Sequence, residues 1–167
     1  MKTGHSSGST FHPGHHRQLY DDAMHDPYQE ACKPAGTAVC DGCGAAYREG
    51  AWHWEAHATN AAITKCPACR RIHDRRPAGY LTVGGRFLTE HHDDLVNLIR
   101  RVETREKAEH PLKRIMAIRV EDNKLLIETT DAHLARGIGE ALESAYKGDL
   151  RFHYNKGDHL LRVEWER

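Results

Sequence analysis

Two Cys-x-x-Cys pairs carry the clearest chemistry in this chain of 167 residues. They are Cys40-Asp-Gly-Cys43 and Cys66-Pro-Ala-Cys69, and 22 residues separate Cys43 from Cys66. Each pair can offer two thiolates to one tetrahedral ion, and the segment between them is long enough for a hairpin that brings the pairs together. The spacing therefore predicts a Zn²⁺ ion bound by all four cysteines. Because no position would be open for an activated water, we expect this metal to be structural.

Other roles for the cysteines fit the sequence less well. Disulfides need an oxidising compartment, and residues 1–30 contain no apolar run typical of a signal peptide. A thioredoxin-like pair would open a helix after a buried strand, whereas Cys40-Asp-Gly-Cys43 is typical of a knuckle turn. Cys32 is either a spare thiol or a replacement for one ligand. Three histidines could also replace a ligand: His53, His57 and His73.

The elements that would position the cysteines form a four-cysteine zinc-ribbon module, which we expect over residues 32–86. Trp52 and Trp54 alternate in the segment between the pairs and indicate a strand with one aromatic face. The segment Tyr80–Val83 precedes two glycines, and it indicates a closing strand and turn of the same module.

Residues 1–31 predict a disordered tail, because they are rich in Gly, Ser and His and lack aliphatic periodicity. Within it, Asp26-Pro27-Tyr28 is a segment that could order on a partner. A solvated tail is the expected state, although its histidines could bind metal weakly or respond to acid. They are His5, His12, His15, His16 and His25.

Residues 87–167 predict an α+β domain with two helices. The first should begin near Thr89, which is a plausible N-cap, and end before Pro111. The second should begin at Thr130 or Asp131 and stop at Gly148. Each helix has an apolar stripe typical of packing on a core, formed by Leu95, Leu98, Ile99 and Val102 in one and by Leu134, Ile138, Leu142 and Ala145 in the other.

A predicted hairpin follows each of these helices. The first pairs residues 115–120 with 125–129, and the second pairs residues 150–154 with 161–165, each across a polar turn. The order helix, hairpin, helix, hairpin predicts a four-stranded antiparallel sheet with both helices on one face. The expected fold class is therefore α+β, with an N-terminal zinc ribbon of four cysteine ligands followed by this sheet.

The charge is unevenly placed along a chain whose formal net charge is zero. Residues 65–86 contain six basic side chains and a single acidic one, Asp74. Arginine binds phosphate bidentately and stacks on bases, and tryptophans offer stacking surfaces for unpaired bases. The residues predicted to bind RNA are Lys65, Arg70, Arg71, Arg75, Arg76, Trp52 and Trp54. The alternatives are that the tryptophans fill the ribbon core and that the arginines pair with Asp93 and Asp94.

Enzymatic and membrane functions find little support. The chain has no Gly-x-x-x-x-Gly-Lys-Ser/Thr phosphate loop and no evident nucleophile and base pair. His91-His92-Asp93-Asp94 is typical of a charged helix start, because adjacent helical residues point in different directions. No apolar stretch approaches the roughly 18 residues of a membrane span. We expect a cytoplasmic protein that is not an enzyme and takes no small-molecule substrate.

Taken together, these motifs resemble an uncharacterised bacterial zinc-ribbon family. That family is distantly similar to the N-terminal zinc-knuckle and α+β region of the archaeal and eukaryotic adaptor for export of the large ribosomal subunit. The stretches that carry the resemblance are 26–28, 39–47, 52–54, 66–72, 77–82, 105–115 and 130–142.

This resemblance implies a protein that binds the ribosome or ribosomal RNA. Its site would be the large subunit, with ribosomal proteins as further contacts, and it would act as a stress, hibernation or assembly factor. The export role does not carry over, because the adaptor has more cysteine pairs and further domains. Two alternatives stay open, namely a DNA-binding or transcription-associated zinc module, and a protein-protein adaptor that binds no nucleic acid.

Overall fold

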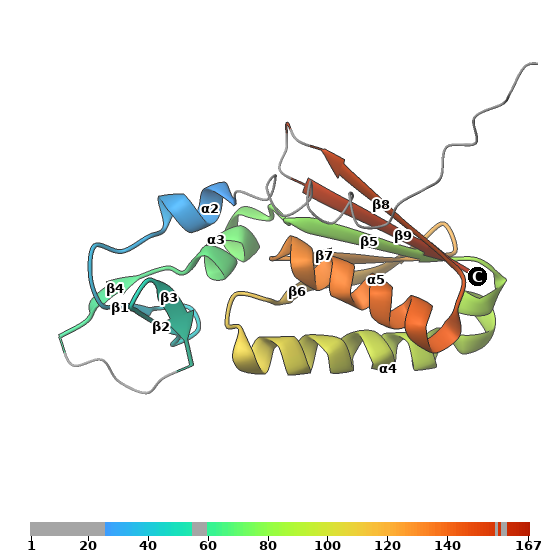
Figure 1. Ribbon diagram of the computed structural model, residues 1–167, viewed down its shortest axis with the longest axis horizontal. Coiled ribbons are helices and arrows are strands. Elements are labelled where there is room, and N and C mark those ends of the chain that lie inside the picture. The colour runs from blue at the N-terminus through green and yellow to red at the C-terminus, as the bar shows by residue number, and fades with distance from the viewer. Residues whose placement is uncertain (1–25, 55–59, 156, 158–159) are drawn as a thin grey trace, which may run out of the picture.

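The computed structural model describes residues 26–54, 60–155, 157 and 160–167 (Figure 1). The predicted disordered tail up to residue 25, with its five histidines, lies outside the described residues, as does His57. The described chain is α+β, with one sheet near the cysteines and a second sheet covered by two long helices. None of the helices in these ranges is both long enough and apolar enough to cross a membrane.

A small mixed sheet carries the first cysteine pair. Its strands are β1 (Ala38–Cys40), β2 (Ala46–Arg48), β3 (Ala51–His53) and β4 (Ala62–Thr64), in the order β3-β2-β1-β4. Strand β4 runs parallel to β1, and the other neighbours are antiparallel. The predicted strand at Trp52 is therefore confirmed as β3. Tyr47 and Trp52 are the large apolar side chains buried in the core of this sheet.

Helix α3 (Pro67–Asp74) begins within the second cysteine pair, with Cys66 as its N-cap and Cys69 in its first turn, and a short helix, α2 (Pro27–Ala31), packs beside it. The prediction of a disordered tail up to residue 31 is thus wrong for its last residues. Asp26 caps α2 by accepting a hydrogen bond from the Tyr28 amide at 2.9 Å. The local composition is poor in apolar residues, so the helix depends on contacts with α3 that the sequence pattern does not show.

A mixed sheet of five strands forms the larger part of the fold, instead of the expected four antiparallel strands. Its order is β6-β7-β5-β9-β8. Strand β5 occupies the centre, antiparallel to β7 and parallel to β9. The strands are β5 (Gly79–Gly84), β6 (Ile115–Glu121), β7 (Lys124–Thr129), β8 (Asp149–Asn155) and β9 (Leu160–Glu166).

Strand β5 is the segment that we expected to close the zinc ribbon, and that assignment is wrong. Leu81 and Val83 of β5 are fully buried against the two long helices and the neighbouring strands. Gly79 permits this packing, because a Cβ there would lie 2.7 Å from the Cβ of Ala135. A single apolar strand does not reveal which sheet it joins, whereas the two hairpins were predicted correctly from their turns.

The two long helices, α4 (Arg86–Glu109) and α5 (Ala132–Tyr146), pack on one face of this sheet (Figure 1). Helix α4 begins before the expected Thr89. Its N-cap is Gly85, whose φ of +91° and contact with the Arg167 carbonyl leave no room for a Cβ. Asp131 caps α5 through a hydrogen bond from the Leu134 amide, which selects one of the two predicted caps. The opposite face of the sheet has no helix over it among the described elements.

Candidate metal centre and basic surface

The four cysteine sulfurs come together in one cluster. The Sγ atoms of Cys40, Cys43, Cys66 and Cys69 all lie within 4.8 Å of one another. Cys43 Sγ and Cys66 Sγ are 3.8 Å apart. A tetrahedron with Zn–S bonds of about 2.3 Å has edges of about 3.8 Å, so this separation fits a shared ion. The geometry is consistent with a structural metal site such as zinc.

Each cysteine pair lies in a tight backbone turn that brings its two sulfurs into the cluster. In the first turn, the Gly44 amide donates to the Cys40 carbonyl at 2.9 Å, and Gly44 has a φ of +76°. A Cβ at Gly42 would lie 3.0 Å from Cys69 Sγ, so this glycine lets the two turns approach. In the second turn, two backbone amides donate hydrogen bonds to sulfur: the Cys66 amide to Cys40 Sγ at 3.2 Å, and the Cys69 amide to Cys66 Sγ.

Arg114 is a member of this centre that the sequence reasoning missed. Its guanidinium donates to Cys43 Sγ at 3.0 Å and to Cys69 Sγ at 3.3 Å, while its Nε donates to the Pro111 carbonyl. The side chain is buried, and it reaches the cysteines from the segment between α4 and β6. Four thiolates around a divalent cation carry a net charge of −2, so one guanidinium offsets half of that charge. Hydrogen bonds of this kind to sulfur support metal ligands.

The protonation of the thiols reflects these contacts. The pKa of Cys43 is lowered, chiefly by its hydrogen bond with the Cys66 thiol and further by Arg114, whereas the pKa of Cys66 is raised by the same pairing and by burial. Cys43 is therefore the sulfur of this pair that loses its proton more readily, and a cation bound between the two would hold both as thiolates. Burial alone would lower the pKa of Arg114, but its bonds to Cys43 and Cys69 raise it, so the guanidinium stays charged.

The alternative ligands do not join the cluster. Among the described residues, the group that could hold a metal contains the four cysteines alone, without Cys32, His53 or His73. Cys32 is buried at the end of α2, and burial raises the pKa of its thiol. His73 instead lies 2.9 Å from the Asp74 carboxylate. His57, the remaining alternative, lies outside the described residues.

Arg71 has a structural role in place of the predicted RNA contact. Its side chain is 6% exposed, and its guanidinium contacts the Asp26 carboxylate at 2.5 Å and the Arg76 carbonyl at 3.0 Å. It also lies 4.2 Å from the centre of the Tyr28 ring. These contacts fasten α2 to α3. Because the charge of Arg71 is paired with Asp26 and buried, its guanidinium is not available to an RNA phosphate.

The two tryptophans also serve packing. Trp52 is 8% exposed and its ring lies 5.4 Å from that of Tyr47, so it fills the core of the small sheet and offers little surface to a base. Trp54 is 40% exposed, but its Nε1 donates to the Lys107 carbonyl at 2.5 Å and its ring lies 5.6 Å from the Arg114 guanidinium. Trp54 therefore links β3 to the end of α4.

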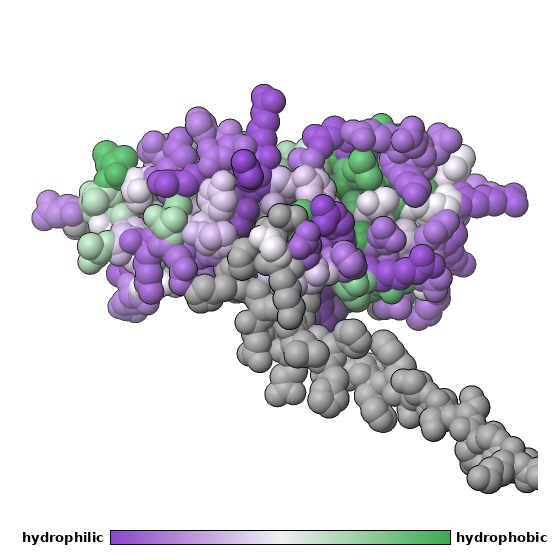
Figure 2. Space-filling view, turned by 90° about the horizontal axis from the view of Figure 1, so that it is seen from above, coloured by the Kyte–Doolittle hydropathy of each residue, from purple (hydrophilic) through white to green (hydrophobic). Residues whose placement is uncertain are grey.

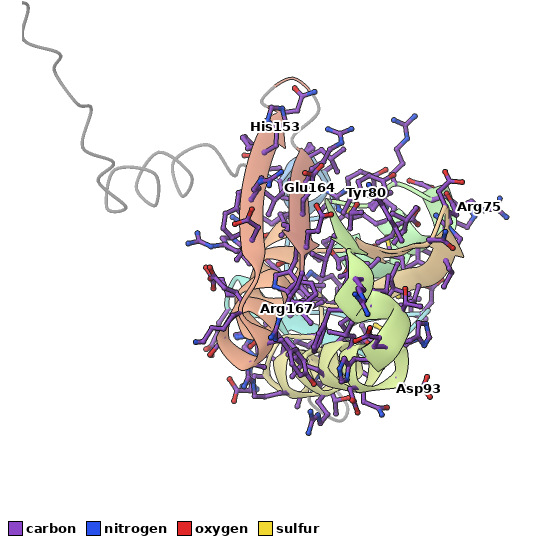
Figure 3. All side chains as sticks on the ribbon, turned by 90° about the vertical axis from the view of Figure 1, so that its right-hand side faces the viewer. Arg75, Tyr80, Asp93, His153, Glu164 and Arg167 are labelled. Atoms are coloured by element: carbon purple, nitrogen blue, oxygen red, sulfur yellow. The ribbon has the colours of Figure 1, made fainter. Side chains whose placement is uncertain are left out.

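Four of the predicted basic residues stay at least partly accessible: Lys65, Arg70, Arg75 and Arg76. In the described part of the chain, none of them forms an ion pair, and the suggested pairing with Asp93 and Asp94 is not found. Those carboxylates lie beside His92 and His91 instead. Figure 3 shows Arg75 well separated from Asp93, which lies on the helical side of the molecule.

Comparisons with known proteins leave this chain without an assigned family. No protein-family model, no curated protein and no solved structure matches it. The resemblance to a bacterial zinc-ribbon family therefore stays a prediction.

Proposed function

We propose that this chain is a non-enzymatic zinc protein that binds RNA, with ribosomal RNA of the large subunit as its partner. The observation that carries the proposal is the position of Arg75 and Arg76. They lie directly after the helix that starts at the second cysteine pair, they are exposed, and they form no ion pair within the described ranges. Free guanidinium groups on a rigid support suit phosphate recognition.

Zinc would contribute structure to this function. The four thiolates complete a tetrahedral shell, so the ion would cross-link the two turns and leave no position for a substrate. Helix α3 starts at Cys66, which is both a member of the cluster and the N-cap of the helix. The orientation of Arg70, Arg75 and Arg76 would therefore depend on the metal.

Fluorescence anisotropy with a labelled RNA oligonucleotide tests the proposal. The native chain should bind at low salt and lose affinity as salt increases. For a single strand, the slope of log K against log salt is about −0.7 per phosphate contact, so the double variant Arg75→Glu, Arg76→Glu should make it shallower by about 1.4. The matched control is Arg101→Glu, Arg105→Glu on α4, which makes the same change of charge elsewhere and should leave binding unchanged.

Two further measurements identify the partner. Sedimentation of cell extract through sucrose gradients should place the chain with the large subunit at low salt and release it at high salt. Crosslinking followed by sequencing of the bound nucleic acid should return ribosomal RNA. Recovery of DNA would support the transcription-associated alternative instead. No nucleic acid at any salt concentration would contradict the proposal and favour a protein-protein adaptor.

A further inference from the structure

A groove lies beside Arg75 and Arg76, where α2 and α3 meet the end of the larger sheet. Its volume is about 630 Å³, within the range of about 300–1,000 Å³ that small ligands occupy. Two tyrosines from distant parts of the chain line it, Tyr28 of α2 and Tyr80 of β5. Leu160 and two prolines supply apolar surface, and Arg75 and Arg76 supply exposed positive charge, since the charge of Arg71 is already paired with Asp26. The groove thus combines aromatic rings with positive charge.

Tyr28 is held in place before any ligand arrives. Its hydroxyl donates to the Asp74 carboxylate at 3.1 Å, and the Arg71 guanidinium lies 4.2 Å from the centre of its ring. Arg71 is itself fixed by Asp26. A ring with a fixed position loses little conformational entropy when a planar group stacks on it. This arrangement favours recognition of a flat, apolar group near a phosphate.

Tyr80 extends the groove onto the helix-free face of the sheet. Leu81 and Val83 of β5 point into the core, so Tyr80 and Thr82 face the other side. The partner of Tyr80 in β9 is Arg162. Figure 3 shows Tyr80, Glu164 and His153 on the same side of the molecule, away from Asp93, and Figure 2 shows a mostly hydrophilic surface on the face that it views.

Both phenols stay neutral at physiological pH. Burial raises the pKa of Tyr28, with a further contribution from its hydrogen bond to Asp74. Burial also raises the pKa of Tyr80, and the charge of Glu128 adds to the effect. Neutral rings do not repel a phosphate backbone.

We propose that this groove binds unpaired nucleotides of single-stranded RNA, with bases stacked on Tyr28 and Tyr80 and phosphates held by Arg75 and Arg76. This inference rests on the proposed function and narrows its ligand from RNA in general to unpaired segments. In a duplex the bases are stacked within the helix and cannot reach the rings, so the groove discriminates against paired RNA. A protein ligand would use the same arginines but would not need both rings.

The test compares a labelled single-stranded oligouridine with an RNA duplex of equal length, using the full chain loaded with zinc. The native chain should prefer the single strand. One stacked base is worth about 1–3 kcal/mol, so Tyr80→Ala should weaken single-strand binding by about 5- to 150-fold. Tyr80→Phe keeps the ring and should bind like the native chain. The salt slope should be unchanged in Tyr80→Ala, because the phosphate contacts persist.

A matched control is Phe152→Ala, which removes an aromatic ring that is 44% exposed on β8 and does not line the groove. It should bind as tightly as the native chain. Zinc content and thermal unfolding of each variant establish that the fold is intact.

The outcomes separate this inference from the proposed function. Equal binding of single strand and duplex, or native affinity in Tyr80→Ala, would overturn the groove while leaving RNA binding in place. A native chain that binds neither RNA at low salt would overturn both. Loss of affinity in Tyr80→Ala with recovery in Tyr80→Phe would support both.

Discussion

The cysteine-bearing sheet has a much smaller apolar core than the five-stranded sheet. The smaller sheet has strands of three residues, and its large buried apolar side chains are Tyr47 and Trp52. The larger sheet packs against α4 and α5 through an extended core that includes Leu81, Ile138 and Trp165. So small a core as that of the first sheet seldom folds without a staple. We therefore expect the stability of the smaller region to depend on the four sulfurs and the ion that they would hold, and that of the larger region to depend on apolar packing.

The two regions are nevertheless connected at the metal centre. Arg114 precedes β6 of the larger sheet, and its guanidinium contacts Cys43 and Cys69 of the smaller region. Trp54 makes the reverse connection, since it lies on the cysteine side and donates to the Lys107 carbonyl at the end of α4. The cysteine cluster therefore lies at the junction between the two regions.

Loss of the metal should have the largest effect, and it should be confined to one region. Structural Zn²⁺ contributes about 10–16 kcal/mol in small zinc modules, so Cys66→Ser should unfold residues 37–76 and abolish zinc binding. Heteronuclear NMR should show dispersed signals for residues 79–167 alone. The control is Cys32→Ser, which changes a buried cysteine outside the cluster and should retain one zinc per chain.

Global unfolding of Cys66→Ser, or a folded smaller sheet without metal, would each refute the division of roles between the two regions.

A cavity in the core of the larger sheet should lower the stability of that sheet and leave zinc binding intact. Ile138 is fully buried on α5, and removing its side chain should cost about 2–5 kcal/mol. Urea unfolding should show this loss for Ile138→Ala, while the zinc content stays at one ion per chain. If zinc binding fell with core stability, the two regions would form a single cooperative unit instead of two separately stabilised ones.

Substitution of Arg114 tests the junction between the regions. Arg114→Gln removes the charge opposite the thiolates, and the zinc dissociation constant should increase by about 10- to 100-fold, as for other groups that support metal ligands. Competition with a chromogenic chelator measures this constant. Arg119→Gln, which changes a more exposed arginine on β6, is the control and should have no effect. Unchanged zinc affinity in Arg114→Gln would show that the guanidinium contributes nothing to metal binding.

The smallest effect is expected at the contact between α2 and α3. Asp26→Asn retains a good helix cap but loses the charge that faces Arg71. We expect a loss of about 1 kcal/mol. Hydrogen exchange should accelerate within residues 27–31 and around Arg71, and stay unchanged in the larger sheet. Faster exchange throughout the chain would mean that α2 stabilises the whole fold and not α3 alone.

Features encoded by local spacing were predictable from the sequence. The cysteine cluster follows from two Cys-x-x-Cys intervals, the hairpins from their turn residues, and α5 from its periodic apolar stripe and its Asp131 cap. In each case, the residues that decide the structure are close together in the chain. These elements are also where sequence and structure agree best.

Features that depend on distant contacts were not predictable. Strand β5 pairs with β9, about 80 residues later in the chain, and no local pattern specifies this parallel neighbour. Arg114 contacts Cys43 across 71 positions, and its surroundings resemble an ordinary basic stretch. Arg71 belongs to the basic cluster by composition, and only its contacts with Asp26 and Tyr28 reveal its burial. A charged residue in a sequence does not disclose its partner.

If a metal-held module presents the residues that contact RNA, the RNA affinity of one preparation should differ with and without zinc. The zinc-free chain should bind a single-stranded oligonucleotide at least about tenfold more weakly, because its phosphate contacts lose their common support. The amide NMR signals of the larger sheet should stay dispersed and show that the larger core is intact. Equal affinity of the two forms would show that RNA binding does not depend on the metal.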